Sequence, residues 1–296
     1  MSEAAVSIQN LTRVFRVGSW KKREVTAVDN VSIHVAPGEV YGLIGPNGSG
    51  KSTTMKVLLG LLRATAGTCS IFGKDSARVD SREDVGYLPE NPYFYRHLTG
   101  RETLAFYGKL CGLRGADLRS RIGEMLHMVD LEEAADRRIS GYSKGMLMRI
   151  GLAQAVIHRP GLVLLDEPTA GVDPMGSRKI RDLIIGLKAQ GITVILSSHL
   201  LEQVQEVCDR IGIIFRGKLV REGTLSELTK VQDQMEIILG GATPELLASL
   251  RAQVDAAGGQ WLSSGNPRTT LERYFIEVTG TTPEEREYAV SDIKRS

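Results

Sequence analysis

The chain has 296 residues, of which 42% are hydrophobic and 24% charged, as is ordinary for a folded globular protein and not for a disordered or fibrous one. Its 37 lysine and arginine residues nearly balance 35 aspartate and glutamate residues, so charge gives no argument for nucleic acid or anionic lipid as the primary partner. The longest apolar runs are far shorter than the ~20 residues that cross a bilayer, and the N-terminal residues lack a secretory signal pattern, so we expect a cytoplasmic protein.

The first half of the chain changes from β-rich to helical. Residues 6–44 contain short β-rich runs, and the last of these, Val40–Ile44, has the pattern of a buried strand. A loop and a helix at about Ser52–Leu62 follow. Residues 92–160 have helical patterns, which predicts a helical subdomain.

Strand patterns return in the second half. They cover Leu162–Leu165, Thr193–Ser197 and Ile211–Phe215, and a helical stretch at Met175–Lys188 separates the first two. Strands that alternate with helices are typical of a largely parallel sheet. The sequence therefore predicts an α/β core.

A domain boundary is expected near Lys230. Thr224 and Glu227 have the spacing of a capping box, which predicts one more short helix, and no dense glycine motif follows it. We therefore assign residues 1–230 to the main domain and residues 231–296 to a small C-terminal domain.

The C-terminal domain has an α+β pattern. Met235–Leu239 and Tyr274–Val278 have strand patterns. Between them, Thr243-Pro244-Glu245 has the composition of a helix start, with Leu246, Leu250 and Val254 on one face of the helix.

A phosphate-binding pattern follows the Val40–Ile44 strand and precedes the predicted helix, which is the context that this pattern requires. Its glycines let backbone N–H groups face phosphates, Lys51 can reach the β- and γ-phosphates, and the Ser52 hydroxyl can reach Mg²⁺. The simpler alternative is a glycine-rich turn. The residues expected to bind ATP here are Gly45, Pro46, Asn47, Gly48, Ser49, Gly50, Lys51, Ser52 and Thr53.

Two carboxylates, Asp166 and Glu167, end the apolar strand Leu162–Leu165. In a P-loop ATPase the first carboxylate holds Mg²⁺ and the second orients or deprotonates the attacking water. Taken alone, the pair could be a strand that enters an acidic turn, but beside a phosphate-binding loop the catalytic interpretation is favoured.

Ser143 has the position of a helix N-cap before an apolar periodic stretch. Its hydroxyl, the following N–H groups and the helix dipole could bind an anion. From these residues alone, a capped helix that binds nothing is the favoured interpretation.

The motifs GPNGSGKS, GYLPE, YSKGM, LVLLDEP, AGVD and SSH occur in this order between about residues 6 and 230. Together they resemble the ABC ATPase family. The resemblance implies a P-loop NTPase fold of the ABC ATPase type with a helical subdomain. It also implies a dimer, homodimeric or with a related ATPase, in which two ATP molecules lie between the subunits.

The resemblance also implies roles for single residues. Phe15 would stack on adenine, with Trp20 as the alternative, and Glu90 would occupy the Q-loop position near Mg²⁺. Asp173 would belong to the D-loop, Gly171–Asp173. His199 would contact the γ-phosphate, although a lone histidine after a strand is otherwise more often structural.

The expected cofactors are ATP and Mg²⁺. The residues expected at the metal are Ser52, Glu90 and Asp166, and the catalytic residues are Lys51, Glu167 and His199. The signature loop of one subunit, which would touch the ATP held by the other, comprises Ser143, Lys144 and Gly145.

Two residues depart from the family pattern. Lys144 stands where the family commonly has glycine, and Glu90 stands where it has glutamine. Two interpretations remain open. The added charges of Glu90 and Lys144 could compensate each other near the γ-phosphate, or Lys144 could point into solvent while Glu90 merely replaces glutamine as an Mg²⁺ ligand.

A last resemblance concerns transport. Leu271–Gly280 is similar to the terminal segment of ATPases that serve ABC-2-type exporters. This implies an exporter ATPase that lies at the inner face of the membrane through separate permease subunits, with no nucleic acid partner. The alternatives are a soluble ABC-type ATPase that acts on nucleic acid or ribosomes, and a regulatory module that barely hydrolyses ATP.

Overall fold

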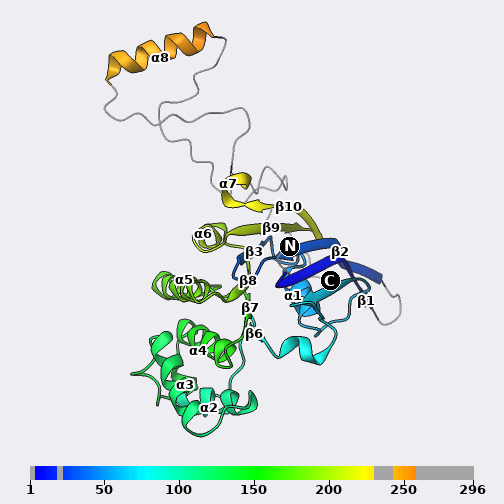
Figure 1. The fold of residues 1–296 in the computed structure, drawn as a ribbon, viewed down its shortest axis with the longest axis vertical. Coiled ribbons are helices and arrows are strands. Elements are labelled where there is room, and N and C mark those ends of the chain that lie inside the picture. The colour runs from blue at the N-terminus through cyan, green and yellow to red at the C-terminus, as the bar shows by residue number, and fades with distance from the viewer. Residues whose placement is uncertain (1–3, 19–22, 230–242, 258–296) are drawn as a thin grey trace.

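The computed structural model describes residues 4–18, 23–229 and 243–257 (Figure 1). Trp20, Lys230 and the strands predicted at Met235–Leu239 and Tyr274–Val278 lie outside these residues. The predicted boundary near residue 230 and the separate C-terminal domain therefore stay predictions.

A six-stranded sheet forms the centre of the molecule, in the order β10-β9-β3-β8-β7-β6. All neighbouring pairs are parallel except β9 and β10, which confirms the predicted parallel α/β core. The strands are β3 (Val40–Ile44), β6 (Val85–Leu88), β7 (Leu162–Asp166), β8 (Thr193–Ser198), β9 (Arg210–Phe215) and β10 (Lys218–Thr224).

A second, antiparallel sheet has the order β2-β1-β4-β5. The short runs expected before Val40 are here two long strands, because β1 and β2 pair along most of their length. The strands of this sheet are β1 (Val6–Val17), β2 (Arg23–Val35), β4 (Ala66–Ile71) and β5 (Lys74–Asp75).

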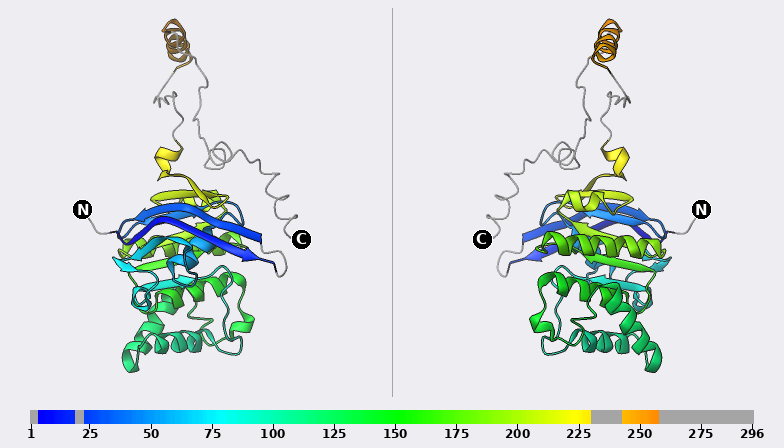
Figure 2. Two further views of the ribbon diagram at one scale, coloured as in Figure 1. Left: turned by 90° about the vertical axis from the view of Figure 1, so that its right-hand side faces the viewer. Right: turned by 90° about the vertical axis from the view of Figure 1, so that its left-hand side faces the viewer.

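The core is divided by the six-stranded sheet. Along β7, Leu162 and Leu164 pack on one face with helix α1 (Lys51–Leu58) and the antiparallel sheet. Val163 and Leu165 pack on the other face with residues of the helices between residues 100 and 228. Successive side chains of a strand point to opposite faces, so this apolar run is buried on both sides. The two views of Figure 2 show these layers.

Helix α1 ends at Leu58, although the sequence pattern predicts a helix as far as Leu62. Gly60 has a left-handed φ of 64°, and a Cβ added there would lie 2.6 Å from the carbonyl oxygen of Ser76. The apolar pattern continues past this residue, but the backbone turns there.

The segment predicted to be helical contains α2 (Gly100–Leu110), α3 (Gly115–Met128), η2 (Ile139–Gly141) and α4 (Lys144–Val156). It lies at the lower end of the molecule in Figure 1. An additional 3₁₀ turn, η1, covers Val79–Arg82.

Four further helices complete the described structure: α5 (Pro174–Ala189), α6 (Leu201–Gln205), α7 (Leu225–Leu228) and α8 (Pro244–Ala256). The capping box predicted at Thr224 is present, and Thr243 caps α8 with Pro244 in its first turn. In the part of the chain that the structure describes, no helix is both long and apolar enough to cross a membrane.

Candidate active site

The predicted site residues lie where parallel strands end. Ile44 of β3 is in register with Ser198 of β8, and Asp166 of β7 is in register with Ser197. The carboxyl ends of parallel strands meet at one edge of a sheet, which is where ligands of such sheets bind. The phosphate-binding loop, the carboxylates and His199 therefore come together.

The backbone of the phosphate-binding loop passes very close to its neighbours at two glycines. A Cβ added at Gly45 would lie 2.1 Å from the carbonyl oxygen of Ile214. At Gly50, where φ is 112°, a Cβ would lie 2.5 Å from the carbonyl oxygen of Ala27. Only glycine fits these two positions, and Gly50 caps α1, so the loop presents the N-terminus of a helix.

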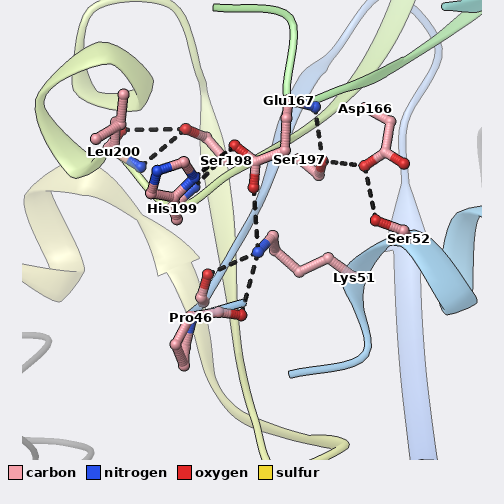
Figure 3. Close-up of polar contacts among 10 residues, drawn as sticks. Pro46, Lys51, Ser52, Asp166, Glu167, Ser197, Ser198, His199 and Leu200 are labelled. Atoms are coloured by element: carbon pink, nitrogen blue, oxygen red, sulfur yellow. Dashed lines mark hydrogen bonds and ion pairs between the residues drawn. The ribbon is translucent and has the colours of Figure 1, made fainter. Parts of the chain in front are cut away.

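Lys51 is buried at the start of α1. Its Nζ donates hydrogen bonds to the carbonyl oxygens of Gly45 and Pro46, at 2.7 and 3.2 Å, and lies 3.2 Å from Oε1 of Glu167 (Figure 3). Only 5% of the Lys51 side chain and 7% of the Glu167 side chain are exposed. A buried ammonium group needs such partners because its desolvation is costly.

Glu167 is fixed by several contacts. His199 Nδ1 lies 2.8 Å from Glu167 Oε2, and the Glu167 N–H donates to Ser197 Oγ at 3.0 Å. Its φ is 50°, an uncommon backbone conformation for a residue other than glycine. Burial raises the pKa of Glu167, but the hydrogen bond with His199 and the charge of Lys51 outweigh burial and leave the pKa below its ordinary value. Glu167 is therefore a carboxylate at neutral pH.

Asp166 shares its Oδ1 between two hydroxyl groups. Ser52 Oγ donates to it at 2.9 Å and Ser197 Oγ at 2.6 Å. Burial and the negative charge of Asp166 raise the pKa of the neighbouring Tyr87 to about 12. A serine hydroxyl beside a carboxylate fits Mg²⁺, which takes few protein oxygens together with water and substrate phosphates.

Phe15 lies on the hairpin beside the phosphate-binding loop. It pairs with Val25 of β2, two residues from Ala27, whose carbonyl oxygen approaches that loop. The guanidinium of Arg13 lies over the ring of Phe15, 4.5 Å from its centroid, and the ring is half-buried. One face of the ring is therefore already covered.

Glu90 is exposed and follows the end of the edge strand β6. It makes no hydrogen bond or ion pair with the other residues that the structure describes. The fold places it beyond the strand next to β7, and no hydrogen bond joins it to Ser52 or Asp166.

The signature loop lies apart from the phosphate-binding loop of its own chain. Ser143 caps α4, as predicted, and its Oγ accepts from the Met146 N–H at 3.3 Å. Asp173 caps α5 in the same way through the Gly176 N–H. Among the described residues, no hydrogen bond or ion pair joins the signature loop to residues 45–53.

Two site residues are absent from the sequence-based expectations. Ser197 holds both Asp166 and the backbone of Glu167, and Tyr87 lies beside Asp166. The signal for Ser197 was its place at the end of a strand predicted to lie in the same parallel sheet as Asp166. Tyr87 belongs to the motif GYLPE, but that motif was used only to place Glu90.

A phosphate-binding loop at the edge of a parallel sheet, with a buried lysine and two adjacent carboxylates, defines a P-loop nucleoside-triphosphate hydrolase. Residues 28–170 match the family described as ABC transporter. The chain is 39% identical over 258 residues to an uncharacterized ABC transporter ATP-binding protein of Synechocystis, covering 86% of this chain and 73% of that protein. The chain therefore belongs to the ABC transporter family, as an ATP-binding and ATP-hydrolysing subunit.

Two further comparisons agree. A fluoroquinolones export ATP-binding protein of Mycobacterium tuberculosis is 38% identical over 298 residues, which cover 95% of this chain and 98% of that protein. A solved dimeric ATP-binding cassette, in a post-hydrolysis state with ADP and phosphate, is 27% identical with a TM-score of 0.68. That likeness covers 74% of this chain and 98% of the other.

Proposed function

We propose that the chain powers export: two cassettes close on ATP, act on separate permease subunits, and reopen after hydrolysis. The observation that carries the proposal is the buried arrangement of Lys51, Asp166 and Glu167 at one sheet edge. The name of the mycobacterial relative supports export as the direction of transport.

ATP binding rests on residues 45–53. Ser49 Oγ is buried without a hydrogen-bond partner in the structure, and a phosphate oxygen would supply one. Lys51 would turn from the carbonyl oxygens of Gly45 and Pro46 toward the phosphates, and the free face of Phe15 would stack on adenine.

Hydrolysis rests on Glu167. Its oxygens are aimed by Lys51 on one side and His199 on the other, so a water beside them would be oriented and would lose its proton to the carboxylate. His199 would also contact the γ-phosphate. Mg²⁺, held by Ser52 and Asp166 with Glu90 approaching from β6, would neutralise phosphate charge.

The signature loop and Asp173 would serve the second subunit. Since the signature loop is not joined to its own phosphate-binding loop, the ATP held there would meet Ser143, Lys144 and Gly145 of a partner. The solved dimeric relative supports dimerisation. The partner would be either an identical chain or a related ATPase.

A groove beside β6 is suited to the permease. It has a volume of about 710 Å³, and Tyr93 and Leu110 on its wall are 85% and 68% exposed. Large exposed apolar side chains that gather around a groove are typical of protein interaction sites. A permease loop seated here would hold the chain at the inner face of the membrane.

Copurification tests the proposal. We expect the tagged full-length chain to bring down a multi-span membrane protein, and Tyr93→Ser with Leu110→Ser to lose it while ATPase activity remains. A chain that copurifies with ribosomes or nucleic acid instead would contradict the transport function. Steady-state ATPase activity close to background would favour the regulatory module.

A further inference from the structure

The Lys144 side chain lies across Gly171 of its own subunit. A Cβ added at Gly171 would lie 2.7 Å from Lys144 Nζ and 3.6 Å from both Cδ and Cε. Gly171 has a left-handed φ of 65° and offers no side chain, so the lysine rests on bare backbone. This contact joins the signature loop to the D-loop, Gly171–Asp173.

The contact continues behind Lys144. A Cβ added at Gly145 would lie 3.3 Å from Val172 Cγ1 and 3.6 Å from Asp173 Oδ1. A Cβ at Gly176 would lie 2.6 Å from the same Val172 atom. The start of α4 and the start of α5 therefore touch through small residues, and Lys144 covers the exposed side of this contact.

The turn that leads to the D-loop and is covered by Lys144 begins at Glu167. The Ala170 N–H donates to the Glu167 carbonyl oxygen at 3.1 Å, and the Val172 N–H donates to that of Thr169 at 3.2 Å. The D-loop is thus a direct continuation of the segment that fixes Glu167. A change in its mobility would reach the carboxylate through only a few hydrogen bonds.

The ammonium group of Lys144 forms no hydrogen bond or ion pair with the residues that the structure describes, and the side chain is exposed. An exposed charge of this kind contributes little by itself. The aliphatic part of a lysine, in contrast, can cover surface while its charge stays in water.

We infer that Lys144 is a positioning residue that holds the D-loop against α4 in its own subunit by covering Gly171. The effect on catalysis rests on the proposed function, whereas the contact itself does not. The replacement of glycine by lysine in the signature loop then acts on Glu167 of the same chain through the D-loop.

Hydrogen exchange of the full-length, nucleotide-free protein tests the contact. In Lys144→Ala we expect the amides of residues 170–173, 175 and 176 to exchange on the order of fivefold faster. Alanine favours helix at least as well as lysine, so a loss of amide protection in this variant cannot come from a lower helix propensity. In Lys144→Met, which keeps an unbranched side chain that can cover Gly171 but lacks the ammonium group, most of the protection should return.

Lys109→Ala, on an exposed position of α2, is the matched control and should leave these amides as in the wild type. Unchanged exchange in Lys144→Ala would overturn the proposal. Equal loss of amide protection in Lys144→Ala and Lys144→Met would also overturn it, because the ammonium group and not the aliphatic chain would then hold the D-loop.

ATPase kinetics give a second measurement. Lys144→Ala should lower kcat about tenfold with little change in KM for ATP, and Lys144→Met should recover most of the loss. Rescue by Lys144→Arg but not by Lys144→Met would assign the effect to charge and refute the covering role. If the wild type shows no ATPase activity, the proposed function fails, while the exchange experiment still decides the contact.

Discussion

His199 and Glu167 are joined through one carboxylate oxygen, with His199 Nδ1 lying 2.8 Å from Oε2, while the other oxygen faces Lys51. Each oxygen of the carboxylate therefore has its own partner. A carboxylate held in this way keeps its orientation before a substrate arrives, which its proposed role as general base requires.

Glu167→Gln should keep ATP binding and lower the hydrolysis rate by at least ~10²-fold, because the amide cannot accept the proton from water. The ATP-bound dimer should then accumulate, and gel filtration with ATP and Mg²⁺ measures it. Glu133→Gln, an exposed glutamate on the helical segment, is the control and should behave as the wild type. A monomeric Glu167→Gln protein with ATP bound would show that Glu167 has another role.

The lowered pKa of Glu167 predicts that the difference in stability between the wild type and Glu167→Gln depends on pH. Its carboxylate stabilises the fold above the pKa of an unfolded glutamate, about 4.3, and this contribution is lost as the pH falls through the lower folded-state pKa. The free energy of unfolding of the wild type should therefore exceed that of Glu167→Gln most clearly near neutral pH. Urea unfolding between pH 7 and pH 3 measures it, and a difference that stays constant with pH would contradict the argument.

Ser197→Ala should weaken the binding of Mg²⁺ at Asp166. The variant loses the hydroxyl that holds Asp166 Oδ1 and accepts the Glu167 N–H. The Glu167 N–H keeps the carbonyl oxygen of residue 197 as an acceptor, at 3.2 Å, so the main loss falls on Asp166. The released carboxylate should raise the Mg²⁺ concentration needed for half-maximal ATPase activity. Ser120→Ala on the surface of α3 is the control, and an unchanged Mg²⁺ requirement would mean that Ser52 alone positions Asp166.

The parallel sheet and the site could be predicted because their signals are local. The apolar run before Asp166 and the glycines before Lys51 each define a short segment, and parallel strands then bring the segments together. Contacts between distant segments have no such signal. The contacts of Ser197 with Asp166, of Arg13 with Phe15 and of Lys144 with Gly171 depend on how side chains pack in the folded chain, which neither periodicity nor composition encodes.

Deleting residues 231–296 should leave a folded domain that binds ATP. Every motif of the site precedes the predicted boundary, and the six-stranded sheet and its two apolar clusters are formed by residues before it. Nucleotide affinity measured on the truncated and full-length chains tests the division. A folded truncation that no longer binds ATP would mean that the C-terminal segment contributes to the site.

The two departures from the family pattern, Glu90 and Lys144, should act independently. If they compensated near the γ-phosphate, Glu90→Gln with Lys144→Gly would recover part of what Lys144→Gly loses. In this structure Lys144 lies on Gly171 of its own chain, and Glu90 is exposed beyond β6. The free-energy effects of mutating two residues without shared partners add to within about 0.5 kcal/mol. For two residues in contact, the coupling energy is about 0.5–3 kcal/mol. A double-mutant cycle on ATP-dependent dimerisation should therefore be additive, and a larger coupling energy would place the lysine beside the partner's phosphates when the dimer closes.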